Sequence, residues 1–280
     1  MPSRRTVSLL RTSVLTIAGL AAAFVSSIAT AQSSDKTVQE IERYRQMLQD
    51  GNPAELLVMR GEELWKTKRG PKNASLEQCD IGLGAGVVKG AYAQLPRYFA
   101  DADQVMDFEA RLVHCMVTLQ GFDRAAITKS PFSGAGQRQT DIESITTYVV
   151  EQSRGMPIAV PQNHPKERAS FDRGKQLFYM RSGPYDFACS TCHGVDNQRI
   201  RLQDLPNFEK PEPAQRAFST WPAYRVSQGA LRTMQWRLND CFRQQRWPEP
   251  IFVSQGTIDL ITYLGVRANG GTMHSPAIKR

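Results

Sequence analysis

The chain has 280 residues, of which 41% are hydrophobic and 22% are charged, enough for one large globular domain or two small ones. Lysine and arginine (35) outnumber aspartate and glutamate (27), for a formal charge of +8. This excess is too small and too scattered to indicate nucleic-acid binding, but it suits an anionic substrate or an acidic protein partner.

The N-terminus has the pattern of a cleaved secretory signal. Arg4, Arg5 and Arg11 precede an apolar stretch over 14–28, and the small residues 29–31 follow it. That stretch is short and interrupted for a membrane span. We therefore expect cleavage after Ala31, export to the periplasm, and a mature chain of 249 residues with a formal charge of +5 and no membrane span.

Apolar residues recur at helical spacing along most of the mature chain, which predicts a mainly α fold. The predicted helices are 38–50, 53–67, 104–120, 141–153, 169–181, 225–245 and 257–264. Prolines at 157, 161 and 165 indicate a linker over 153–170. The basic, polar tail after Ala268 is expected to be disordered.

Residues Cys189-Ser190-Thr191-Cys192-His193 form a C-x-x-C-H motif, the attachment sequence of c-type haem. Its two thiols can reach the two vinyl groups of one porphyrin, and the adjacent imidazole can bind the iron. A zinc site would need a second ligand pair, and a thioredoxin-like pair would not need the histidine. The motif predicts one covalent haem c with His193 as an axial ligand, which agrees with export.

Three matches in the same order indicate an internal repeat. Segment 61–71 matches 174–184 at an offset of 113, and this offset pairs Cys79 with Cys192. The other two matches pair 111–115 with 237–241 and 147–148 with 262–263. The alternative is a coincidence of common helix residues.

The repeat predicts two cytochrome c-like domains, of which only the C-terminal one carries haem. Leu76 and Asp80 stand where the second copy has Cys189 and His193, so the first copy lacks the haem ligands. The predicted organisation is a signal at 1–31, a haem-less domain at 32–152, a linker at 153–170 and a haem domain at 171–280.

Two cysteines of the first copy, Cys79 and Cys115, should face the same vacated haem space. In an oxidising compartment we expect a disulfide between them, although two separate buried thiols are the alternative. The bond would close a loop of 36 residues and contribute about 3–4 kcal/mol by the loop-entropy estimate.

Cys241 is then left unpaired, 48 residues after His193, where a cytochrome c places its second axial ligand. Arg237 lies one helical turn earlier on the same face and would favour the thiolate. Met234 is the alternative ligand, with Cys241 as a spare buried thiol. The region also carries Arg225, Arg232, Arg243 and Arg246, which could form a solvated face, pair with haem propionates or bind a small dianion.

The sequence resembles a known family, the SoxA cytochromes of the SoxAX complexes of bacterial thiosulfate oxidation. The resemblance covers essentially the whole mature chain and is carried by 79–98, by the motif at 189–194 and by Arg237-Leu238-Asn239-Asp240-Cys241. It implies a single-haem member, because Leu76 and Asp80 replace the first haem's ligands. Such members are thought to carry a disulfide in the first domain.

The resemblance also implies an enzyme, L-cysteine S-thiosulfotransferase, which joins thiosulfate to a cysteine of the carrier protein SoxYZ. Electrons would leave through haem to the partner cytochrome SoxX. By motif, His193 and Cys241 would be the axial ligands, Arg237 would bind substrate, and Cys241 would be the catalytic sulfur, found in the family as a persulfide.

Two other functions remain compatible with the haem motif. A plain periplasmic electron-transfer cytochrome would need no substrate chemistry, and a scaffold would use the haem-less domain only to dock partners. The unpaired Cys241 and the spacing of Arg237 favour the enzyme.

Overall fold

The computed structural model describes residues 51–200 and 203–279, together with Lys36, Gln39, Glu40, Arg43, Tyr44 and Met47. Residues 1–51 and 52–280 are two separate units. The predicted signal sequence and most of the predicted helix 38–50 lie outside the described residues. Within the described part of the chain, no helix has the length and hydropathy that a membrane span requires.

The first half of the second unit is built from short helices around one β-hairpin. Its hydrophobic core lies between the helices and includes Trp65, Leu112 and Ile145. The elements are α2 (Ala54–Lys66), η1 (Leu76–Gln78), η2 (Tyr92–Gln94), β1 (Arg97–Phe99), β2 (Gln104–Met106), α3 (Phe108–Thr118), α4 (Arg124–Thr128) and α5 (Asp141–Glu151).

The second half is also mainly helical and has a core of its own, which includes Phe178, Phe218 and Tyr263. Strands β5 and β6 pair antiparallel, and β7 joins β5 in parallel. The elements are α6 (Pro165–Tyr179), α7 (Cys189–His193), β3 (Arg199–Ile200), β4 (Gln203–Asp204), α8 (Pro211–Phe218), β5 (Ala223–Arg225), η3 (Val226–Gln228), β6 (Ala230–Arg232), α9 (Met234–Gln244), α10 (Gln255–Arg267) and β7 (Ala277–Lys279).

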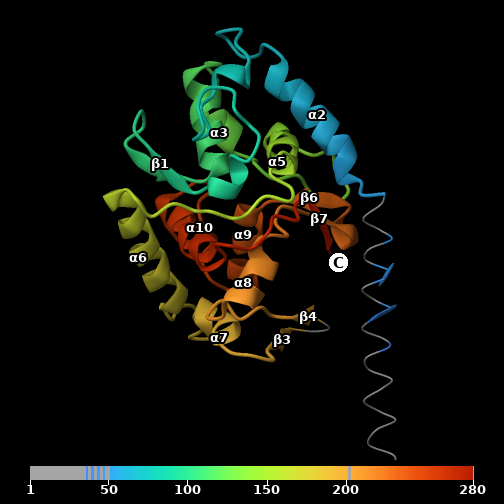
Figure 1. Cartoon of the computed structure of the whole chain (residues 1–280), viewed down its shortest axis with the longest axis vertical. Coiled ribbons are helices and arrows are strands. Elements are labelled where there is room, and N and C mark those ends of the chain that lie inside the picture. The colour runs from blue at the N-terminus through green and yellow to red at the C-terminus, as the bar shows by residue number, and fades with distance from the viewer. Residues whose placement is uncertain are drawn as a thin grey trace, which may run out of the picture. The chain divides into compact units, whose positions relative to one another are not determined.

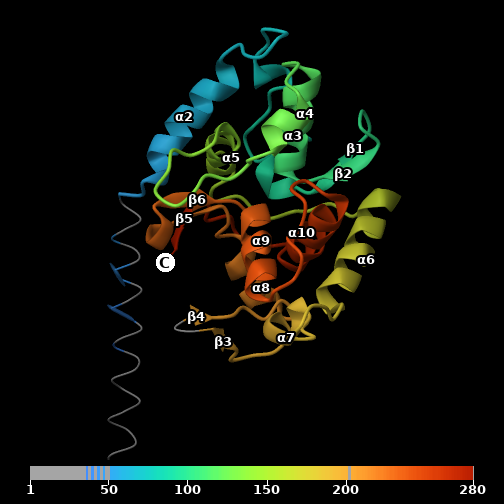
Figure 2. The same cartoon turned by 180° about the vertical axis from the view of Figure 1, so that it is seen from behind.

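Each half contains a pair of helices that cross closely, α2 with α5 and α6 with α10 (Figures 1 and 2). A glycine allows each crossing. A Cβ added at Gly61 would lie 2.1 Å from the Ser144 carbonyl oxygen, and one at Gly174 would lie 1.9 Å from the Asp259 carbonyl oxygen. Only a residue without a side chain fits at either crossing.

Helices α3 and α9 begin alike, because each has 11 residues and follows an extended N-cap residue. Asp107 accepts a hydrogen bond from the Ala110 amide, and Thr233 accepts one from the Trp236 amide. The predicted helices 104–120 and 225–245 were therefore too long. The N-caps end the preceding strands β2 and β6, and each helix begins only after its cap.

The tail after Ala268 is ordered, contrary to the prediction of disorder. Its strand β7 pairs with β5, so that Ala223 lies opposite Ala277 and Arg225 opposite Lys279. The amide of Ile158 also bonds the Gly271 carbonyl, and the amide of Met273 bonds the Met156 carbonyl. The predicted linker 153–170 is partly helical too, because Pro165 occupies the first turn of α6, where proline is favoured.

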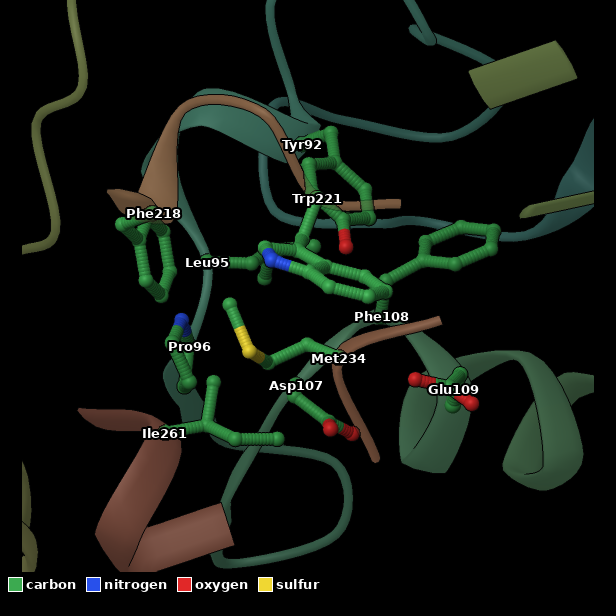
Figure 3. Close-up of a pocket in the computed structure, with 10 residues that line it drawn as sticks. All are labelled: Tyr92, Leu95, Pro96, Asp107, Phe108, Glu109, Phe218, Trp221, Met234 and Ile261. Carbon is green, nitrogen blue, oxygen red and sulfur yellow. The ribbon is translucent and has the colours of Figure 1, made fainter. Parts of the chain in front are cut away.

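Two buried carboxyl groups lie where the two halves meet. Asp107 accepts a hydrogen bond from Gln235 (2.6 Å), and Glu109 accepts one from Thr233 (2.8 Å). Both line a cavity of about 10 Å³, room for about one water, beside Trp221 (Figure 3). Burial raises the pKa of Asp107 to about 6 and that of Glu109 well above its usual range. These hydrogen bonds attach the start of α9 to α3.

The helix crossing gives a first testable prediction. Gly174→Ala forces α6 away from α10 and should lower the free energy of unfolding by about 3 kcal/mol, the upper range for overpacking. Gly256→Ala is the matched control, because its Cβ would meet nothing closer than 3.8 Å, and it should not destabilise. Denaturant unfolding measures both; equal stabilities for the two variants would contradict the tight crossing.

The buried carboxyl at Asp107 gives a prediction about pH. Because burial raises its pKa to about 6, the folded state binds this proton more tightly than the unfolded chain does. The free energy of unfolding should therefore fall as pH rises from about 4 to about 6, and Asp107→Asn should flatten this slope. Asp123, the exposed N-cap of α4, is the control, and Asp123→Asn should leave the slope unchanged.

Candidate functional site

The C-x-x-C-H motif forms a helix of its own, α7 (Cys189–His193). The Thr191 hydroxyl accepts a hydrogen bond from the Ala188 amide and holds the start of this turn. Cys189 and Cys192 are free thiols and partly buried. The structure therefore presents both sulfurs and the imidazole from a single helical turn, as attachment of one porphyrin requires.

The ring of His193 is oriented by a backbone carbonyl. Its Nδ1 lies 2.9 Å from the Pro206 oxygen, to which it must donate, and the ring packs edge-on against Phe208. Burial is the main cause that lowers the pKa of His193, so the ring is neutral. Nε2 is then left as the metal-binding nitrogen, the usual arrangement of a ligating histidine. These residues fit a c-type haem.

Cys241 lies on α9 within electrostatic range of both haem thiols. Its charge adds to burial in raising the pKa of Cys189 to about 12, and Cys192 raises the pKa of Cys241. Burial is the main cause acting on Cys241 and raises its pKa, whereas Arg237 lowers it by less. The prediction that Arg237 favours the thiolate is right in direction, but the thiol needs metal coordination to ionise.

Met234, the alternative axial ligand, belongs to the hydrophobic core. It is 6% exposed, and Figure 3 shows its side chain beneath the Trp221 ring, near Pro96 and Ile261. No interaction connects it to the described residues of the C-x-x-C-H motif. Of the two candidate ligands, Cys241 is the one that acts electrostatically on the described residues of the motif.

Arg237 is held by a buried carboxylate on its own helix. Asp240 accepts hydrogen bonds from Arg237 (2.8 Å), Arg243 (2.6 Å) and Gln244 (2.9 Å). The Arg237 guanidinium also lies 5.8 Å from the Trp221 ring centre, and Lys279 lies 5.6 Å from the same ring. The other N–H groups of Arg237 make no hydrogen bond to a described residue, so they remain for a ligand.

The structure separates the five arginines of this region. Arg232 is buried in an ion pair with Glu143 (3.2 Å) and serves the interior. Arg243 and Arg246 are exposed. Arg225 is partly buried, and its pKa is lowered, first by burial and then by the charge of Arg237, with a smaller contribution from Arg232. Asp240 and Cys241 act in the opposite direction and raise it by less. Of these five arginines, Arg225 and Arg237 are the two whose charges act on Cys241.

The first half has a disulfide at the corresponding place. Cys79 and Cys115 are bonded, with their Cα atoms 5.8 Å apart, as the sequence predicted. Leu76 is fully buried, and the Asp80 carboxylate accepts hydrogen bonds from the amides of Gly82 and Gly84 in a tight bend. A cleft of about 540 Å³ lies beside the disulfide.

Sequence reasoning missed three members of the site. Pro206 orients His193 through its carbonyl, and no side-chain pattern marks that role. Trp221 lies beside Arg237, and Lys279 reaches it through the pairing of β7 with β5. Because the tail after Ala268 was predicted to be disordered, Lys279 was not expected at the site.

Comparison with known proteins identifies a family and a fold. A family model described as "SoxA/TsdA, cytochrome c domain" matches residues 60–158, the part before the C-x-x-C-H motif. The crystal structure of SoxXA from P. pantotrophus has a similar fold, with a TM-score of 0.69 and 23% identity over 85% of this chain and 84% of that chain.

Two relatives extend the likeness to most of the chain. The "L-cysteine S-thiosulfotransferase subunit SoxA" of Hydrogenophilus thermoluteolus is 53% identical over 243 residues, 87% of this chain and 88% of its own. The protein of the same name from Hydrogenobacter thermophilus is 32% identical over 260 residues, 91% of this chain and 94% of its own. The chain belongs to the SoxA family.

Proposed function

We propose that the chain is the SoxA subunit of an L-cysteine S-thiosulfotransferase. The reaction joins thiosulfate to a cysteine thiol of the carrier SoxYZ: R–SH and S₂O₃²⁻ give R–S–S–SO₃⁻, one proton and two electrons. The observation that carries this proposal is that Cys192, Arg237 and Arg225 all act electrostatically on Cys241, in a chain 53% identical to a protein of that name.

One haem c would be held by Cys189 and Cys192 through covalent bonds, and by His193 and Cys241 as ligands of its iron. When bound, haem c supplies one-electron redox chemistry, by which electrons pass to the SoxX subunit. The protein's part is to fix the ligands: the Pro206 carbonyl orients His193, and α9 positions Cys241.

Cys241 is the catalytic sulfur. It takes up the sulfonate-bearing sulfur of thiosulfate in the two-electron step and forms Cys241–S–S–SO₃⁻. The carrier thiolate then attacks that group, and the Cys241 thiolate leaves. Arg237 binds the sulfonate oxygens through the N–H groups that Asp240 does not use, and Asp240 holds the guanidinium in place.

The chain consists of two cytochrome c-like domains, which accounts for the matching local geometry. The haem-less domain is at 32–152, the linker at 153–170 and the haem domain at 171–280. Gly61 and Gly174 make equivalent helix crossings, and β1–β2 and β5–β6 are equivalent hairpins. In the first domain the Cys79–Cys115 disulfide takes the place of haem as a cross-link.

The protein is exported by the signal at residues 1–31 and acts in the periplasm as a heterodimer with SoxX. A plain electron-transfer cytochrome is the alternative function. The names of the relatives and the two arginines beside Cys241 favour the transferase.

The test is thiosulfate-dependent electron transfer by the complete heterodimer in the presence of the carrier. Cys241→Ala should abolish turnover because the sulfur acceptor is lost. Arg237→Ala should lower kcat/KM for thiosulfate roughly a hundredfold, the size expected for a charge-assisted contact that strengthens in the transition state.

Arg216→Gln is the matched control, since it removes an exposed arginine of α8 that pairs only with Glu212 among the described residues. It should behave as the wild type. Full turnover by Arg237→Ala with an unchanged thiosulfate requirement would contradict the role given to Arg237, and full turnover by Cys241→Ala would contradict the proposed function.

A further inference from the structure

Arg111 in the first half and Arg237 in the second half are equivalent positions at an offset of 126, and their surroundings differ. In the first half the charge of the Arg111 guanidinium is paired with a carboxylate. Its Nη1 donates to both carboxylate oxygens of Asp101 (2.8 and 2.7 Å), its Nε donates to the Asp80 carbonyl (2.6 Å), and it lies 4.2 Å over the Phe99 ring. An arginine so paired has little capacity left for an anion.

In the second half the same positions carry different groups. The hairpins correspond at an offset of 126: Phe99 ends β1 opposite Gln104, and Arg225 ends β5 opposite Ala230. At this offset Arg225 replaces Phe99, and Ser227 replaces Asp101. The aromatic ring and the neutralising carboxylate are both gone, and a second guanidinium has taken the place of the ring.

Arg225 has no partner for its charge. Its Nε is buried without a hydrogen-bond acceptor, and its guanidinium makes no ion pair with any residue between 51–200 or 203–279. Asp240, the acidic group that faces it, already accepts hydrogen bonds from Arg237, Arg243 and Gln244. Two neighbouring cations with one shared carboxylate are unfavourable until an anion joins them.

We propose that Arg225 is a second sulfonate-binding residue, which holds the terminal oxygens of thiosulfate, and of the thiosulfonate on Cys241, from the β5 side while Arg237 holds them from α9. This inference rests on the proposed function. A sulfonate offers three oxygens to two guanidinium forks, which suits a group that must be held while its sulfur is transferred.

A haem propionate is the other oxyanion that two guanidinium groups could bind, so the test must separate the two. Arg225→Gln removes the charge, and Arg225→Lys keeps the charge but loses the planar fork. Each is compared with Arg216→Gln in the intact heterodimer. The measurements are haem content, reduction potential, KM and kcat for thiosulfate, and calorimetric binding of thiosulfate to the ferric protein.

Arg225→Gln should raise the KM for thiosulfate, and its calorimetric Kd, roughly tenfold to a hundredfold, the loss expected for one charge-assisted contact. Arg225→Lys should fall between that variant and the wild type. Haem content and reduction potential should stay at wild-type values. Any other pattern overturns the proposal; in particular, a changed potential with unchanged thiosulfate binding assigns Arg225 to a propionate.

A variant at the exposed Ser227 provides a second test that leaves Arg225 itself unchanged. Ser227→Asp introduces a carboxylate at the position that corresponds to Asp101 in the first half. It should weaken thiosulfate binding because the carboxylate would pair with the arginines, whereas Ser227→Asn should not weaken it. Equal binding by the two variants would contradict the proposal. If the wild type binds thiosulfate but does not turn over, the proposed function fails, and the binding data still decide the role of Arg225.

Discussion

The site depends on how helix α9 is fixed to the first half of the fold. Cys241 and Arg237 both project from this helix, and its first turn is anchored to two buried carboxyl groups. Thr233 donates to Glu109 and Gln235 donates to Asp107, and the amide oxygen of Gln235 accepts the Val253 amide. Buried polar groups of this kind are costly when left unpaired, so they fix the position of α9 closely.

The two halves use the same local geometry for different ends. In the first half Cys115 is bonded to Cys79, and Arg111 is paired with Asp101. In the second half the corresponding cysteine, Cys241, is free, and the corresponding arginine is bound to a buried Asp240 that leaves most of its donors unused. The first half therefore has a disulfide and an ion pair where the second half has a free thiol and unused hydrogen-bond donors. Unused donors are what a binding site for an oxyanion requires.

Much of the helical framework could be predicted from the sequence because apolar periodicity and glycine spacing are local signals. Segments 53–67 and 141–153 agree closely with α2 and α5. The strand boundaries could not be predicted in this way: β5 and β6 are three residues each, and β5 gains stability by pairing with β7 some 50 residues later. From the sequence alone, apolar residues in such short strands predict an extension of the helix that follows.

The candidate site was predictable where chemistry has a fixed spacing. The C-x-x-C-H motif and the i, i+4 placement of Arg237 and Cys241 needed only the sequence, and so did the disulfide through the internal repeat. Which of the other arginines face Cys241 depends on tertiary pairing. Arg232 turned out to neutralise Glu143, and Arg225 was left with its charge unpaired, a difference that no local pattern encodes.

The most direct test of the central claim, that Cys241 is the sulfur at the iron, is low-temperature EPR of the ferric protein beside its Cys241→Ala variant. We predict a low-spin, thiolate-type signal in the wild type that disappears in the variant, because Met234, the alternative axial sulfur, is packed in the core. A histidine–methionine signal unchanged by the substitution would contradict it and would leave a simple electron carrier with Cys241 as an ordinary buried thiol.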